Sequence, residues 1–229
     1  MSKQLLVMPL QTTSENTSVP NETLAPWRPS LARALHRNRA VPFSRYFQLA
    51  TVQANGKPAN RTVVFRGFLA NTNRLMVVSD RRSEKTEQIS HNANAAVCWY
   101  FTKTREQFRL SGQITAVTAD TPAATMTTAR KQIWQTLSDS ARGQFIWPQP
   151  KASRADAAAF SAPEVGSQTP SASFCLLLLD VEYVDHLELR GDPQNRCIYR
   201  RNDSPGDRSS GQPAVPKPDQ KWQVTSVNP

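Results

Sequence analysis

The chain has 229 residues and a formal net charge of +10 at pH 7, and this length is enough for one well-buried domain. No apolar run approaches the roughly eighteen residues of a membrane-spanning helix, and three scattered cysteines without a Cys-x-x-Cys pair favour buried reduced thiols over a disulfide framework or a metal site. We therefore expect a cytoplasmic protein with no membrane contact, whose positive charge suits a phosphorylated ligand, nucleic acid or an anionic surface.

The N-terminal part of the chain differs from the rest. Residues 1–24 are rich in Ser, Thr, Asn and Pro, which predicts a disordered segment. An amphipathic helix is expected from Ser30, with Ser30 as its N-cap. A first strand is expected at 46–53, and the turn signal Asn55-Gly56 leads into the second.

Strands dominate the remainder. Further helices are predicted at 86–92, at 121–137 with Asp120 as cap, and at 138–144, followed by an extended proline-rich piece at 145–150. A loop dense in Ser, Gly, Pro and Asp at 202–218 is expected to be mobile. Short apolar or alternating runs predict strands at 61–67, 74–78, 95–101, 107–117, 174–189, 195–201 and 221–227.

This order of elements predicts a mainly β chain with inserted helices. About seven short strands interrupted by helices at two places favour an antiparallel Greek-key barrel over a doubly wound sheet. The eight glycines fall singly, without a Gly-x-Gly-x-x-Gly or P-loop run, so a Rossmann-type dinucleotide fold is disfavoured.

Candidate functional residues concentrate between positions 61 and 112. Ser79, Ser83 and Lys85 stand beside a predicted helix N-terminus, where free N–H groups and the helix dipole favour an anion. Arg61 and Arg66 lie near the two ends of one strand; strict alternation places them on opposite faces, unless a bulge or a ligand over the strand end brings them together. Together these residues predict a phosphate site, although each cation alone is equally typical of a solvated surface.

Other chemistry-bearing residues have weaker signals. Gln107 is either a surface position or a buried amide that needs partners. Trp99 and its aromatic neighbours favour a core role over a cofactor platform. The three histidines share no spacing with acids or cysteines, so we assign none of them a catalytic role.

Taken together, the residues resemble the pyridoxamine 5′-phosphate oxidase family of FMN-binding split barrels, and most closely its divergent FMN-binding-domain branch. The family's Arg, four residues, Lys-Gly element stands here as the segment 61–67, with Arg66 in the lysine's place. Its Ser-Arg-Lys triplet stands as Ser83-Glu84-Lys85, its Arg-Gln pair as Glu106-Gln107, and its terminal arginine as Arg196.

The resemblance implies one FMN-binding split-barrel domain at 25–229, working as a homodimer with the flavin between two subunits. It also implies a role for each matched residue. Arg61, Ser83 and Lys85 would hold the FMN phosphate, with Ser79 beside them. Arg66 and Gln107 would contact the isoalloxazine edge, and Arg196 would reach in from the C-terminal strand.

The substrate-binding segments of the authentic oxidase are not matched. Where that enzyme binds its B6 substrate and the substrate's phosphate, this chain has Asp192-Pro193-Gln194 and the apolar piece 145–150. Pyridoxamine phosphate is therefore disfavoured as substrate. We expect a flavin-dependent oxidoreductase for an unidentified small substrate, with no catalytic residue assigned. The alternative is a flavin carrier or sensor without turnover. Nucleic-acid binding is disfavoured because the basic residues are dispersed without a recognition helix.

Overall fold

The computed structural model describes residues 23–161, 165–202 and 221–229. The predicted disordered segment at 1–24 and mobile loop at 202–218 lie outside these residues, apart from positions 23, 24 and 202. No helix in the described part of the chain is long and apolar enough to cross a membrane. The helices and strands are α1 (Arg28–Arg37), β1 (Tyr46–Val52), β2 (Pro58–Phe68), β3 (Leu75–Asp80), α2 (Glu84–His91), β4 (Asn94–Phe101), β5 (Glu106–Val117), α3 (Ala124–Gln135), α4 (Asp139–Gly143), β6 (Phe174–Glu188), β7 (Asn195–Arg201) and β8 (Trp222–Val227), with 3₁₀ turns η1 (Gln144–Ile146) and η2 (Ala157–Phe160).

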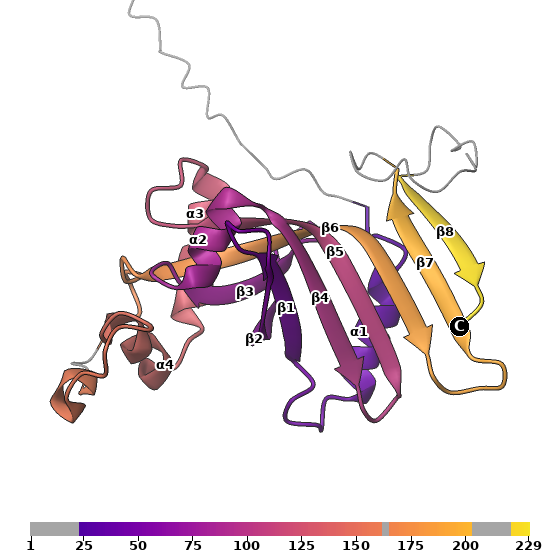
Figure 1. Cartoon of the computed structure of the whole chain (residues 1–229), viewed down its shortest axis with the longest axis horizontal. Helices are drawn as coiled ribbons and strands as arrows, with labels where there is room; N and C mark the ends of the chain where they lie inside the picture. The colour runs from indigo at the N-terminus through magenta and orange to yellow at the C-terminus, as the bar shows by residue number, and fades with distance from the viewer. Residues whose placement is uncertain (1–22, 162–164, 203–220) are drawn as a thin grey trace, which may run out of the picture.

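The strands form an antiparallel barrel with a two-stranded extension. The sheet runs in the order β3-β2-β1-β4-β5-β6, and β3 also pairs with β6, which closes the barrel. The long strand β6 pairs with β3 through its first half and with β7 through its second half, so β7 and β8 continue the sheet away from the barrel (Figure 1). This arrangement confirms the predicted split barrel.

The burial pattern explains why the strand sequences differ. Strand β4 alternates between exposed and buried residues because only one of its faces meets the barrel core. The first six residues of β6 are all buried because both faces are covered. Cys175 and Leu177 enter the barrel core, while Phe174 and Leu176 pack with Trp134 of α3 on the other side.

The predicted N-cap residues of two helices are wrong. Helix α1 starts at Arg28 with Trp27 as N-cap and a proline in its first turn, so Ser30 is not the cap. Helix α3 starts at Ala124, because Pro122 disfavours helical geometry in the residue before it. Asp120 therefore does not cap α3, and its carboxylate pairs with Arg81 at 3.2 Å.

Two smaller predictions also need correction. The piece at 145–150 is not wholly extended, because the chain between 144 and 146 forms the turn η1. The three cysteines are unpaired, as expected, but only Cys175 is buried. Cys98 lies on an outward position of β4 and is exposed, because strand alternation overrides the apolar character of its neighbours.

Candidate functional site

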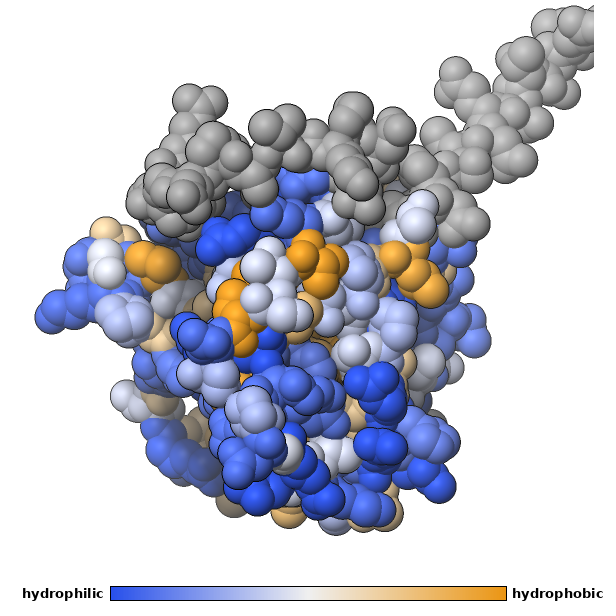
Figure 2. Space-filling model, turned by 90° about the vertical axis from the view of Figure 1, so that its right-hand side faces the viewer, coloured by the Kyte–Doolittle hydropathy of each residue, from blue (hydrophilic) through white to orange (hydrophobic). Residues whose placement is uncertain are grey.

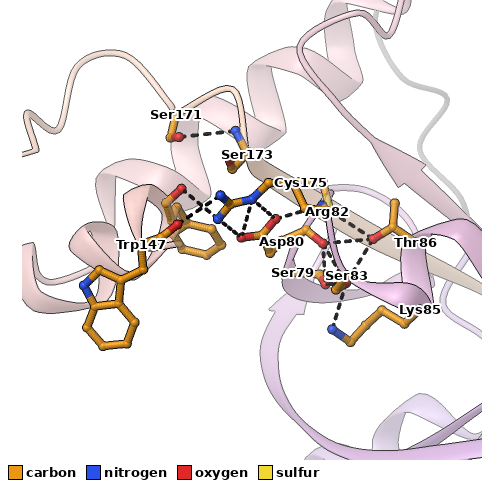
Figure 3. Close-up of polar contacts among 11 residues, drawn as sticks. Ser79, Asp80, Arg82, Ser83, Lys85, Thr86, Trp147, Ser171, Ser173 and Cys175 are labelled. Carbon is orange, nitrogen blue, oxygen red and sulfur yellow. Dashed lines mark hydrogen bonds and ion pairs between the residues drawn. The ribbon is translucent and has the colours of Figure 1, made fainter. Parts of the chain in front are cut away.

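The turn between β3 and α2 collects hydroxyl groups at the start of a helix (Figure 3). Ser83 is the N-cap residue of α2, yet its Oγ donates to the carbonyl of Asp80 at 2.7 Å and does not cap the helix. Thr86 Oγ1 donates to the same carbonyl at 3.0 Å, and Ser79 Oγ lies 3.3 Å from Ser83 Oγ. The first turn of α2 therefore keeps N–H groups without a side-chain cap, which is the arrangement that binds anions.

Arg61 reaches this helix from β2. Its guanidinium donates to Thr51 Oγ1 at 2.6 Å, to Gln88 Oε1 at 2.9 Å and to the carbonyl of Leu49 at 3.2 Å. These partners are neutral, so they fix the position of the guanidinium without cancelling its charge.

Lys85 adds a second cation to the same turn. Its Nζ donates to Ser83 Oγ at 3.0 Å. Burial lowers the pKa of Lys85, and the nearby positive charge of Arg61 lowers it further. Burial also lowers the pKa of Arg61, while Glu84 partly offsets this effect. Two like charges held together in a half-buried turn leave the site short of negative charge, and a phosphate group would supply it.

Arg82 ties the turn to the segment after α4 (Figure 3). Its Nη2 lies 2.6 Å from Asp80 Oδ2, and hydrogen bonding to that carboxylate raises the pKa of Arg82. Its Nη1 donates to the carbonyl of Trp147 at 2.9 Å, and its Nη2 to that of Phe145 at 3.4 Å. The position of 145–147 therefore depends on the same residues that shape the turn.

A cavity of about 500 Å³ lies between this turn and the segment 144–160. Ser79 and Asp80 line one side, and Trp147 and Phe160 line the other. The ring centroids of Trp147 and Phe160 are 5.6 Å apart, and the guanidinium of Arg154 lies 4.6 Å from the Phe160 ring. The wall is therefore mixed in character, with aromatic rings and a cation, and less apolar than the sequence alone indicates.

The remaining predicted residues lie elsewhere. Arg66 is exposed on β2, on the face opposite to Arg61 and Phe65. The pairing register places Gln107 of β5 beside Leu187 of β6, and Leu187 beside Arg196 of β7. Gln107 and Arg196 therefore share one face of the sheet.

On that face, the cation Arg196 is paired with a carboxylate. Gln107 is half-buried, and its Oε1 lies 3.9 Å from Cys98 Sγ. Arg196 is held by the buried carboxylate of Asp185 at 2.9 and 2.7 Å. The second carboxylate oxygen also lies 3.4 Å from Arg109. Arg196 is thus positioned by an ion pair before any ligand binds.

One chain does not bring the two groups of residues together. Thr51, which contacts Arg61, shares a row of the sheet with Ala95 and Gly112. Arg61 itself shares a row with Leu49, Val97 and Leu110 on the core side of the sheet, whereas Gln107 lies on the outer side of β5. The turn at α2 and the face with Gln107 and Arg196 therefore lie on different sides of the sheet.

The sequence reasoning missed the residues that hold Arg61 and the turn in place. Gln88 and Thr51 are buried and hydrogen-bonded to each other at 2.6 Å. Gln88 lies on the inward face of α2. A buried side-chain amide needs hydrogen-bond partners, so a glutamine at such a position is the sequence signal that could have revealed this contact. The role of Arg82 depends on carbonyls more than 60 residues away, so no local pattern reveals it.

The sequence profile described as the FMN-binding domain of pyridoxamine 5′-phosphate oxidase matches residues 24–118. A protein of Arabidopsis thaliana named pyridoxine/pyridoxamine 5′-phosphate oxidase 2 is 39% identical over 170 residues, covering 73% of this chain and 85% of that protein.

Two solved structures share the architecture. A pyridoxamine 5′-phosphate oxidase-related, FMN-binding protein of Nostoc punctiforme is 48% identical, with a TM-score of 0.82, covering 91% of this chain and all of that one. PhzG of Burkholderia lata, solved with tetrahydrophenazine-1-carboxylic acid, has a TM-score of 0.66 at 16% identity over 91% of this chain and 98% of that one, a likeness of fold.

Proposed function

Since this chain belongs to the pyridoxamine 5′-phosphate oxidase family and its matched domain binds FMN, we propose that it is a flavin-dependent oxidoreductase acting on a small organic substrate. The observation that carries the proposal is the turn at α2. There, an uncapped helix N-terminus meets two cations with lowered pKa values, and among the described residues neither cation forms an ion pair with a carboxylate.

In this proposal, Arg61, Ser83 and Lys85 hold the FMN phosphate, and Ser79 lies beside them. The chemistry of the donors supports this role, because a phosphate dianion is bound best by Arg, Lys, hydroxyl and backbone N–H groups together. Gln88 and Thr51 act through Arg61, since they fix its guanidinium through neutral hydrogen bonds.

The isoalloxazine end of FMN contacts Arg66, Gln107 and Arg196, and the two halves of the site come from two copies of the chain. The placement of these residues on different sides of the sheet supports a homodimer: Arg61 shares the core-side row of Leu110, whereas Gln107 lies on the outer side of β5, where a second copy could meet it.

The outer surface of the barrel supports the same assembly. A hollow of about 600 Å³ opens there, with a floor of small side chains that includes Ala50, Ala96 and Ser111. The face seen from the side of β7 and β8 is mostly hydrophilic with a few separate hydrophobic spots (Figure 2). On β8, Val224 and Val227 are exposed; single apolar side chains of this kind are ordinary on a protein surface, so the hollow is the feature that favours an assembly.

When bound, FMN supplies hydride transfer at its N5 atom, and the protein supplies orientation and charge. Cations such as Arg66 and Arg196 favour the negative charge that a reduced flavin carries near N1. The cavity between the turn and the segment 144–160 receives the substrate, because Ser79 and Asp80 belong to both. Its aromatic walls favour a substrate with a planar ring. The unpaired cysteines suit a cytoplasmic location.

The proposal is tested by the absorbance spectrum of protein purified without added flavin, followed by anaerobic mixing with a panel of small planar amines and alcohols. We expect a yellow protein whose flavin absorbance is bleached by at least one member and recovers in air. A protein that binds FMN but is bleached only by dithionite would be a carrier or sensor. A protein with no affinity for FMN would overturn both functions.

A further inference from the structure

A second cluster of polar side chains lies at the end of the barrel near α1, away from α2 and α3 (Figure 1). Glu106 begins β5, and His186 and Glu188 stand two residues apart near the end of β6, on one face of the strand. His186 Nε2 lies 3.1 Å from Glu106 Oε2. One potential ligand atom from each of the three residues falls within 4.8 Å of the others.

The two carboxylates in this cluster lie directly opposite each other. Glu106 and Glu188 are partners in the register of β5 and β6, and like charges at such a position destabilise a sheet. Glu188 is one-third exposed and lies 3.6 Å from Arg33 of α1. Glu106 is 4% exposed, and among the described residues its ion-pair partner is His186 alone.

The ring of His186 is held in place by its neighbours. It stacks on Phe108 with the centroids 4.0 Å apart, and its Nε2 faces the carboxylate of Glu106. An imidazole nitrogen held beside a buried carboxylate oxygen is an arrangement in which both atoms can bind one metal ion.

We propose that Glu106, His186 and Glu188 bind one divalent transition-metal ion, for which Zn²⁺ is the best match. Zinc prefers imidazole nitrogen and carboxylate oxygen at about 2.0–2.2 Å, so the 3.1 Å between His186 Nε2 and Glu106 Oε2 suits two ligands of one ion. Glu188 turns inward to complete the protein ligands, and water fills the remaining position.

The ion would join β5 to β6 beneath α1, so its role is structural and independent of the flavin chemistry. The sequence contains no short metal-ligand spacing, and for that reason it predicted no metal site. Here Glu106 and His186 are 80 residues apart and meet only through strand pairing.

The test is a Zn²⁺ titration of the tag-free, full-length, FMN-loaded protein in competition with a chromophoric chelator. We expect one Zn²⁺ per chain, a higher melting temperature with Zn²⁺, and no competition from Mg²⁺, which prefers all-oxygen sites. Glu188→Gln and His186→Gln should each weaken Zn²⁺ binding by at least about tenfold. Glu87→Gln, an exposed change on α2, and Cys98→Ser should leave it unchanged.

The proposal is overturned if the wild type binds no stoichiometric Zn²⁺, or if both ligand variants bind it as the wild type does. Loss of binding in Cys98→Ser would place the ion on the exposed thiol instead. If His186→Gln fails to fold, as judged by bound FMN and cooperative melting, Glu188→Gln at its partly exposed position decides the outcome.

Discussion

Arg61 and Lys85 carry like charges into a half-buried turn, and the groups around them hold these charges in place. Thr51 and Gln88 are neutral, and Ser83 offers Lys85 only a hydroxyl oxygen. Such a pair repels itself in the absence of an anion, so phosphate binding gains both charge-assisted hydrogen bonds and relief of the repulsion. Each charge-assisted contact of this kind is worth about 1.5–3 kcal/mol.

Cys175 lies directly behind this turn. Because its thiol is buried, the free energy of unfolding should depend on pH in the range where the thiol ionises. Burial raises the pKa of its thiol to about 11, and a hydrogen bond with Thr86 only partly counters this effect. In the unfolded chain the thiol ionises near its ordinary pKa of 9.0, so the stabilisation is complete below that pH and is lost as the pH rises toward 11.

We therefore expect the free energy of unfolding of the wild type to fall by roughly 2 kcal/mol more than that of Cys175→Ala between about pH 9 and pH 11. Urea denaturation curves at several pH values measure this difference. Parallel pH profiles of the two proteins would show that the thiol ionises alike in the folded and unfolded chains.

At the scale of the elements, the pairing of β5 with β6 depends on a close approach at Gly112. The register shifts between Ser111 and Gly112, and a Cβ at position 112 would lie 2.0 Å from the carbonyl oxygen of Asp180. We expect Gly112→Ala to destabilise the protein by about 2 kcal/mol or more, because the clash is with backbone. Gly166→Ala is the control, since nothing lies within 4 Å of its Cβ, and equal urea midpoints for the two variants would refute the expectation.

The junction between the turn and the segment 144–160 depends on Arg82. In Arg82→Ala, the carbonyls of Phe145 and Trp147 lose their donor and Asp80 loses its forked partner. We expect faster amide hydrogen exchange between 144 and 150 and FMN binding weakened several-fold. Arg81→Ala, which removes only an exposed pair with Asp120, should change neither. Identical exchange in the two variants would mean that the segment is held by its own packing.

Strand positions followed from alternation and apolar runs, because each strand of a barrel turns one face to the core. Helix starts were less predictable. Ser30 and Asp120 are residue types that often cap helices, but nearby prolines determined the backbone conformation and so the first helical residue. The gathering of Ser79, Ser83 and Lys85 in one turn was predictable because these residues are close in sequence. The support from Gln88 and Arg82 was not, since those contacts exist only after the barrel closes.

At the scale of the whole molecule, the proposed division of the site between two chains can be tested by complementation. Lys85→Ala removes a residue of the turn, and Arg196→Ala removes one from the opposite face. If each flavin lies between two copies, a mixed dimer of these variants contains one intact site and one doubly altered site.

Refolding the two variants together should therefore restore FMN binding of near wild-type affinity to about half of the sites in mixed dimers, as measured by flavin fluorescence. Light scattering on the wild type should give twice the mass of the chain. A monomeric mass, or no recovery of affinity on mixing, would mean that one chain holds the whole site.

The most direct test of the phosphate turn compares FMN with riboflavin, which lacks the phosphate. Titration of flavin-free wild type, Arg61→Ala and Lys85→Ala should show FMN affinity lowered about 10- to 100-fold in each variant, corresponding to about 1.5–3 kcal/mol. Riboflavin affinity should be unchanged, and Arg81→Ala should match the wild type for both ligands. If the variants bind FMN as the wild type does, or lose affinity for riboflavin equally, the phosphate is bound elsewhere.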